Sequence, residues 1–174
     1  MTMFKNEGWD KEFQERLGGE VYQYLQKDQQ LIEYLSDYRY VRDHIRQQGR
    51  GWQLSDNSLL VLHICKFFEG VLHLLMRDLV PAYLIQKPES IRGFILNNRS
   101  EIERIIDAHV LLDGMSKQEI KDRLFALVQD FRDRNQALHS GSFLKLGELE
   151  NFDAILTKIR DVVRPLRENG FVRT

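Results

Sequence analysis

LLVLHICKFFEGVLHLLM, residues 59–76, is the stretch that decides the fold of this chain. Its 18 residues reach the lower limit for a helix that spans a membrane. It carries His63, Lys66, Glu69 and His73, however, and a charged side chain at the centre of a bilayer costs roughly 2.5–3.5 kcal/mol. We therefore predict a buried central helix in an all-α bundle, and no membrane span.

Helical signals continue on both sides of this stretch. Apolar residues recur at helical spacing, and no long alternating run of β-branched residues predicts a strand. Ser90 and Ser100 are expected to cap helices, and Ser116 with Glu119 forms a capping box. The predicted helices span residues 9–17, 20–48, 59–80, 91–96, 100–112, 117–138 and 149–167.

Length, charge and cysteine content narrow the class of protein. The 174 residues fit one domain, with N-terminal helices over 1–50 and a core bundle over 57–168. A net charge of −1 excludes a uniformly basic nucleic-acid binder but allows a local basic site. Cys65 is the only cysteine, which excludes an internal disulfide and a cysteine zinc site. Because the N-terminus also lacks the apolar core of a signal peptide, we expect a cytoplasmic protein.

The segment RNQALH, residues 134–139, is the strongest candidate for catalysis. Arginine carries a permanent charge and a fork of donors suited to phosphate oxygens, and histidine exchanges a proton near neutral pH. Along a straight helix Arg134 and His139 would lie roughly 140° apart, because each of the five steps turns about 100°. We therefore expect the backbone to turn near His139, where Ser140 and Gly141 supply suitable residues.

Spacing alone does not single out this pair of residues. Chance predicts roughly 1.4 such Arg–His pairs in a chain of this composition, and any of them can be a surface arginine with a histidine that ends a helix. Only the Arg134–His139 pair has an asparagine directly after the arginine and a small-residue break after the histidine. The pairs found are Arg39–His44, Arg104–His109, Arg132–His139 and Arg134–His139.

Two groups of polar residues allow more than one interpretation. Lys66, Glu69 and His73 form one narrow polar line at i, i+3 and i+7 on the apolar helix. This line is either the solvent face or a cleft in which Glu69 orients a catalytic histidine or pairs with an arginine. A strip of arginines is either a contact for RNA backbone or a solvated helix face. That strip consists of Arg42, Arg46 and Arg50.

The motif and its context resemble the HEPN superfamily of helical ribonucleases and nucleotide-binding domains. The likeness is greatest to the catalytic HEPN domain of RnlA-type RNase LS toxins, in which an apolar helix with a Leu/Phe-Glu-Gly step precedes the Arg–His motif. Here that step is Phe68-Glu69-Gly70, and Arg134 follows Glu69 by 65 residues. The resemblance covers residues 59–166.

The resemblance implies an HEPN-like helical bundle that pairs as a homodimer, with the two motifs facing each other across a cleft. It implies that RNA is cleaved without metal or cofactor, through attack of the ribose 2′-OH on the adjacent phosphate. His139 would be the general base or acid, and Arg134 would stabilise charge on the phosphate. Glu69 would assist His139, and Asn135 would position the groups. The residues expected to contact RNA are Lys66, His73 and Arg132.

Several alternatives stay open beside a toxin or phage-defence ribonuclease with an antitoxin or inhibitor as partner. One is a catalytically inactive HEPN domain that serves as a protein- or RNA-binding scaffold. Another is the HEPN partner of a nucleotidyltransferase, although such proteins place a tyrosine soon after the histidine and none follows His139. A last one is an unrelated helical bundle.

The sequence departs from the family pattern at two positions. Ser140 stands between His139 and Gly141, and position 135 is asparagine where histidine is common in the family.

Overall fold

The computed structural model describes residues 7–47, 58–84, 90–111, 115–140 and 152–172. These residues form eight α-helices and one 3₁₀ helix and contain no strand, which confirms the predicted all-α class for this part of the chain. No helix among them is long and apolar enough to cross a membrane.

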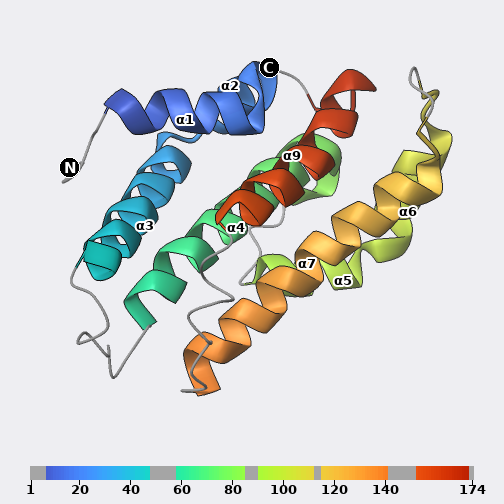
Figure 1. Cartoon of the computed structure of the whole chain (residues 1–174). Helices are drawn as coiled ribbons and strands as arrows, with labels where there is room; N and C mark the ends of the chain where they lie inside the picture. The colour runs from blue at the N-terminus through green and yellow to red at the C-terminus, as the bar shows by residue number, and fades with distance from the viewer. Residues whose placement is uncertain (1–6, 48–57, 85–89, 112–114, 141–151, 173–174) are drawn as a thin grey trace.

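Helix α4 (Ser58–Leu79) runs through the middle of the bundle (Figure 1). Helix α3 (Gln29–Gln47) and helix α7 (Lys117–Ser140) both pack against it. Helix α9 (Phe152–Glu168) packs on α7, and helix α1 (Glu7–Leu17) lies across the bundle and contacts α9. In Figure 1 the C-terminal ends of α3 and α7 and the N-terminal end of α4 gather at one end of the bundle.

Four shorter elements complete the described fold. Helix α2 (Gly19–Leu25) contacts α1, α3 and α9. The 3₁₀ helix η1 (Pro81–Leu84) and helix α5 (Ile91–Asn97) pack on α4, and helix α6 (Arg99–Ala108) packs on α5 and α7. Helix α2 lies beside α1, on the side of the bundle away from α5 and α6 (Figure 1).

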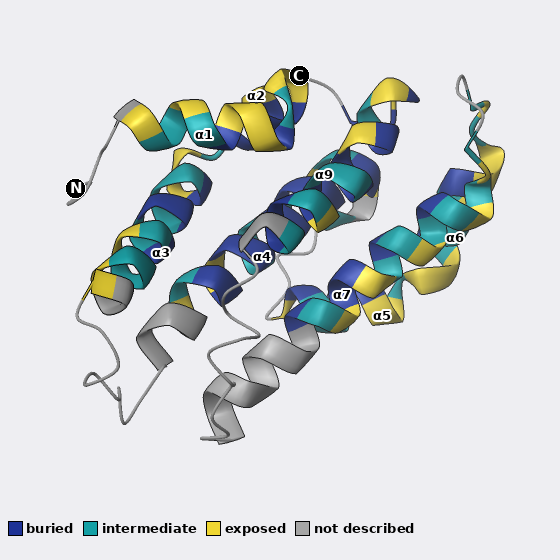
Figure 2. Cartoon of the chain, viewed as in Figure 1, coloured by how far each residue is buried: buried dark blue, intermediate teal, exposed yellow. Residues whose placement is uncertain are grey.

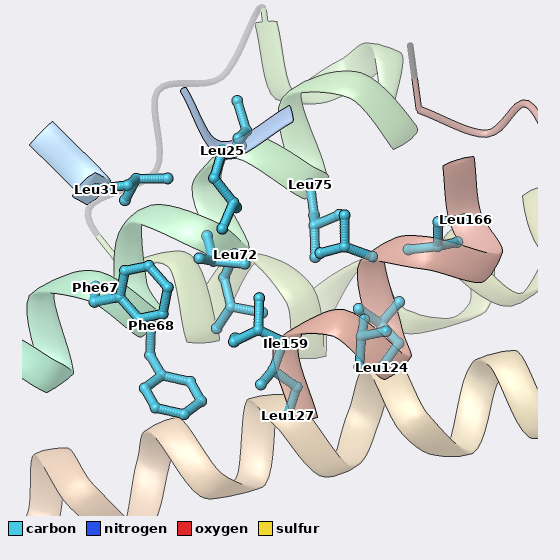
Figure 3. Close-up of a cluster of buried hydrophobic side chains, with 14 of the residues drawn as sticks. Leu25, Leu31, Phe67, Phe68, Leu72, Leu75, Leu124, Leu127, Ile159 and Leu166 are labelled. Carbon is cyan, nitrogen blue, oxygen red and sulfur yellow. The ribbon is translucent and has the colours of Figure 1, made fainter. Parts of the chain in front are cut away.

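The core is built around α4, as the apolar run predicted. Phe68 and Leu72 are fully buried, and burial of each such side chain stabilises the fold by roughly 1.5–3 kcal/mol. Figure 3 shows them beside Leu127 of α7 and Ile159 of α9, so these three helices share one apolar interior. Figure 2 shows that the buried faces of these helices turn toward one another.

The prediction of one helix over 20–48 is wrong, because the structure contains two. Helix α2 ends at Leu25 and α3 begins at Gln29. The carboxylate of Asp28 accepts the backbone N–H of Gln30 at 3.1 Å, and its carbonyl accepts the N–H of Leu31 at 3.0 Å. An aspartate that bonds to nearby backbone in this way favours a helix start over a helix interior. The apolar periodicity continues through the break and conceals it.

Two of the three predicted serine caps are confirmed. Ser90 Oγ accepts the N–H of Gly93 at 3.3 Å, and Ser116 Oγ accepts the N–H of Glu119 at 3.1 Å. The carboxylate of Glu119 forms an ion pair with Arg123 one turn further on. The serine of the predicted capping box therefore caps α7, and the glutamate forms an ion pair on the surface of the helix.

The prediction of a helix over 100–112 with Ser100 as its cap is wrong at both ends. Asn98 precedes α6, so Ser100 lies inside its first turn, and the helix ends at Ala108. His109 is extended because its ring is held elsewhere. Nε2 of His109 lies 2.5 Å from the carbonyl oxygen of Asn169, and the ring packs on Phe171 at 4.1 Å between centroids.

The last two helices differ from prediction mainly in their ends. Helix α7 extends to Ser140, two residues beyond the predicted end, and α9 begins at Phe152, with residues 149–151 outside the described residues. Helix α9 contains Pro165, which has no backbone N–H and therefore leaves the carbonyl of Asp161 without its helical partner. Nη1 of Arg123 donates to that carbonyl at 3.2 Å and so fastens α7 to α9.

Candidate functional site

The Arg–His motif occupies the last two turns of α7, which continues without a break to Ser140. The turn expected near His139 is therefore absent from the helix itself. Five residues of α-helix rise about 7.5 Å and leave positions 134 and 139 roughly 140° apart around the axis. No bend before Ser140 brings the two positions together within one chain. The motif side chains that lie outside the described residues are those of Arg132, Arg134, Asn135 and His139.

The buried residues of α7 form one face of the helix, and the repeat of this face can be followed toward the motif. Leu124, Leu127 and Phe131 are buried and repeat every three or four residues. The same repeat next reaches positions 134 and 135, and the gathered helix ends lie there (Figure 1). Arg134 and Asn135 therefore occupy backbone positions that continue this repeat.

Two other Arg–His pairs have the same spacing, and the structure gives their side chains structural partners. Arg104 forms a pair of 2.8 Å hydrogen bonds with Glu101, while His109 bonds to the carbonyl of Asn169. In the Arg39–His44 pair the arginine contacts Glu12 at 3.0 Å and Asp43 at 2.8 Å, and the histidine stacks on Tyr40. The side chains of these two pairs are therefore engaged within the fold or on its surface, with Arg104 held by a residue of its own helix.

Lys66 and Glu69 form an ion pair on the surface of α4. Lys66 Nζ donates to Glu69 Oε2 at 2.9 Å, and the two side chains are 48% and 33% exposed. This hydrogen bond is the main cause that raises the pKa of Lys66. The structure thus favours the solvent-face interpretation for these two residues, with Glu69 accessible from outside the bundle.

His73, the third residue of the polar line, is held by η1. Its Nδ1 hydrogen-bonds the hydroxyl of Tyr83, whose ring in turn meets Phe94 edge to face at 5.1 Å. Burial lowers the pKa of His73 and raises the pKa of Tyr83. Burial therefore favours the neutral form of His73 in the contact that joins α4 to η1 and α5.

Gly70, the last residue of the Phe-Glu-Gly step, lies where α3 crosses α4. A Cβ atom at this position would overlap the Cδ2 methyl of Leu31, with Leu31 Cγ at 3.6 Å. Leu31 is fully enclosed, with 1% of its surface exposed. The absence of a side chain at position 70 therefore lets α3 approach α4 closely, which gives the step a structural role that its sequence pattern did not reveal.

The α7–α9 groove, which we define as the hollow between these two helices, is a site that sequence reasoning missed. Its volume is about 330 Å³. Leu127 and Val162 form its buried floor, and Ala126 lies at its edge. The charged residues around it are Arg123, Asp130, Lys158 and Asp161. No motif connects them, because the groove forms only when residues from two helices far apart in sequence come together.

A second cavity, of about 240 Å³, lies among α1, α2 and α3. The hydroxyl of Tyr22 donates to Asp10 Oδ1 at 3.2 Å, and burial together with the Asp10 charge raises the pKa of Tyr22 to about 12. Glu33 is the other charged residue in the lining. Since both charged groups are carboxylates, this cavity is unsuited to a phosphate.

The predicted arginine strip is only partly described. The side chain of Arg42 is 12% exposed, and its Nε lies 3.8 Å from Oδ1 of Asp43. Arg42 is therefore not on a solvated face. The side chain of Arg46 and all of Arg50 lie outside the described residues. Among the residues that the structure describes, no three histidine, cysteine or carboxylate side chains gather in a way that could hold a metal ion.

Comparison of the chain with family models, curated proteins and solved structures finds no match.

Proposed function

We propose that this protein is an HEPN-type ribonuclease that cleaves RNA without a metal, with Arg134 and His139 as its central pair. The observation that carries the proposal is the position of the motif. It lies at the end of one continuous helix, α7, which packs against the helix that bears Phe68-Glu69-Gly70. The resemblance to HEPN domains rests on these two segments, and the fold brings their helices into contact.

Two copies of the chain are needed for this chemistry. Positions 134 and 139 are roughly 140° apart on one straight helix, so one chain presents its arginine and histidine in different directions. A two-fold axis beside the end of α7 would bring the histidine of one copy opposite the arginine of the other. The gathered ends of α3, α4 and α7 form the end of the bundle at which this pairing would occur (Figure 1).

The reaction follows from the properties of the two side chains. His139 takes the proton from a ribose 2′-OH, and the oxygen attacks the adjacent phosphorus. The bond from phosphorus to the 5′-oxygen breaks, and that oxygen takes up a proton, which leaves a 2′,3′-cyclic phosphate and a 5′-hydroxyl. Arg134 binds the phosphate oxygens and stabilises their charge in the transition state. Asn135 positions the phosphate.

Glu69 and the residues expected to contact RNA have supporting roles in this reaction. The resemblance gives Glu69 the role of assisting His139, and the exposed ion pair with Lys66 leaves both side chains accessible to RNA. His73 shares its Nδ1 with Tyr83, which leaves only Nε2 for RNA. Arg132 would contact the RNA backbone from α7. Such an enzyme requires an antitoxin or other inhibitor in the cytoplasm, because unrestrained cleavage would destroy the RNA of its own cell.

The test is cleavage of single-stranded RNA in the presence of EDTA. The wild type should give products that end in 2′,3′-cyclic phosphate. His139→Ala should lower kcat roughly 10²- to 10⁴-fold, the usual contribution of a general acid or base. Arg134→Ala should lower it roughly 10²- to 10³-fold with little change in melting temperature.

A matched control comes from another Arg–His pair. Arg104→Ala changes an arginine at the same spacing that bonds to Glu101 on α6, away from the gathered helix ends, so it should retain full cleavage. A wild type that leaves RNA intact would overturn the proposal and favour the scaffold alternative. Equal loss of activity in Arg104→Ala and Arg134→Ala would overturn the assignment of the pair.

A further inference from the structure

The α7–α9 groove has the form of a small ligand site. It has a volume of about 330 Å³, at the small end of the range of roughly 300–1,000 Å³ typical of ligand pockets. Leu127 and Val162 give it an apolar floor that is almost fully buried. A ligand of this size with a flat apolar face would cover that floor.

The rim of the groove carries two cationic and two carboxylate side chains. Lys158 forms an ion pair with Asp130 across the groove, and Arg123 spans it to the backbone carbonyl of Asp161. The four side chains are 29–50% exposed, so water already competes for these bonds and a ligand can exchange with them. Two cations and two carboxylates leave the rim with no net charge, which suits a neutral ligand better than a phosphate.

A nucleobase meets both requirements, and guanine meets them best. Its flat face covers an apolar floor, and its edge presents donors and acceptors side by side. A carboxylate such as Asp130 can accept N1–H and the 2-amino group together, while Arg123 or Lys158 can donate to O6 and N7. The other bases lack this pair of adjacent donors beside two acceptors.

The groove lies next to the proposed site of cleavage. Asp130 precedes Arg134 by four residues of the same helix, which is about one turn and a rise of about 6 Å. We propose that the α7–α9 groove binds a guanine base of single-stranded RNA beside the phosphodiester that is cut. This inference rests on the proposed function for its substrate, and it makes the groove the determinant of base preference.

The experiment measures binding separately from cleavage. The probes are fluorescent 2′-O-methyl heptamers, UUUGUUU, UUUAUUU, UUUCUUU and UUUUUUU, which have no free 2′-OH and cannot be cut. Fluorescence anisotropy on the full chain should show that the guanine heptamer binds roughly 10-fold to 100-fold more tightly than the others. Cleavage of the matching RNA heptamers is measured in parallel.

Three variants test whether the base binds in the groove. Ala126→Trp fills the groove from its exposed edge and should remove the guanine preference. Gln118→Trp adds the same ring to an exposed position of α7 outside the groove and should leave binding unchanged. Asp130→Asn should lower the affinity for the guanine heptamer alone, because an amide cannot accept both guanine N–H groups. Melting temperatures show whether each variant is folded.

The outcomes separate this inference from the proposed function. RNA cleavage with equal binding of all four heptamers would overturn the groove as a guanine site and leave the ribonuclease intact. Guanine-specific binding that is lost in Ala126→Trp, without cleavage of any RNA, would overturn the ribonuclease and support the groove. Equal loss of affinity in Ala126→Trp and Gln118→Trp would also overturn the inference.

Discussion

Gly70→Ala is the substitution that most sharply tests how α3 packs on α4. The new methyl group would overlap Cδ2 of Leu31, which has 1% of its surface exposed and is enclosed by the core. Leu31 must therefore change its rotamer, or the two helices must move apart. Glycine inside a helix normally weakens it, so the same substitution at an open position would stabilise the protein.

The expected magnitude follows from these two opposing effects. Overfilling a well-packed core costs about 1–3 kcal/mol, and replacing a helical glycine by alanine contributes about 1 kcal/mol. With overfilling at about 2 kcal/mol, Gly70→Ala should lower the free energy of unfolding by about 1 kcal/mol. In a Leu31→Ala background the overlap is absent, and Gly70→Ala should raise it by about 1 kcal/mol.

The assay is urea unfolding of the two single variants, the double variant and the wild type. The coupling energy between positions 31 and 70 should be about 2 kcal/mol. Gly93→Ala is the matched control, because its Cβ would meet Ser90 only at 3.7 Å, an ordinary contact. That variant should be neutral or more stable by up to about 1 kcal/mol. Stabilisation of the wild type by Gly70→Ala, or a coupling near zero, would refute the close crossing.

Three further predictions concern single contacts. Ser116→Ala should lower the free energy of unfolding by about 0.5–2 kcal/mol through loss of the helix cap, and an unchanged urea midpoint would contradict that role. Burial lowers the pKa of His73 in the folded state, so the unfolded chain binds its proton first and stability falls as pH drops below about 6.5. Unfolding at about pH 7.5 and about pH 5.5 should therefore show a larger acid loss for the wild type than for His73→Gln, and equal losses would exclude the effect. Glu69→Gln should change the free energy of unfolding by less than about 1 kcal/mol, because the ion pair with Lys66 is exposed. The same variant should lower the rate of RNA cleavage. A large drop in its melting temperature would instead show that Glu69 has a structural role.

Much of the fold could be predicted from the sequence, because its main signals are local. The apolar run lies in α4, where its apolar side chains from Ile64 to Met76 are buried, and the serines at 90 and 116 cap the helices that follow them. The break between α2 and α3 escaped prediction because Asp28 ends one helical pattern and starts the next without a glycine or proline. The end of α6 at Ala108 escaped prediction because the next residue, His109, contacts Asn169, sixty positions away in the sequence.

The candidate site could also be predicted from the sequence only in part. The motif and its helix could be identified from spacing and residue type, but the path of the backbone through His139 depends on how far α7 continues. The role of Gly70 depends on Leu31, which belongs to another helix. The α7–α9 groove joins Asp130 to Lys158 across 28 residues, and no pattern of spacing marks two residues that meet only after the helices pack.

The most direct test of the central claim is a mixture of Arg134→Ala and His139→Ala, each inactive alone. If the histidine of one copy and the arginine of the other act on one phosphodiester, half of the randomly formed dimers contain one intact site of two. The mixture should then recover about a quarter of the wild-type rate of RNA cleavage in EDTA. A mixture that stays as inactive as its two components would contradict the shared site.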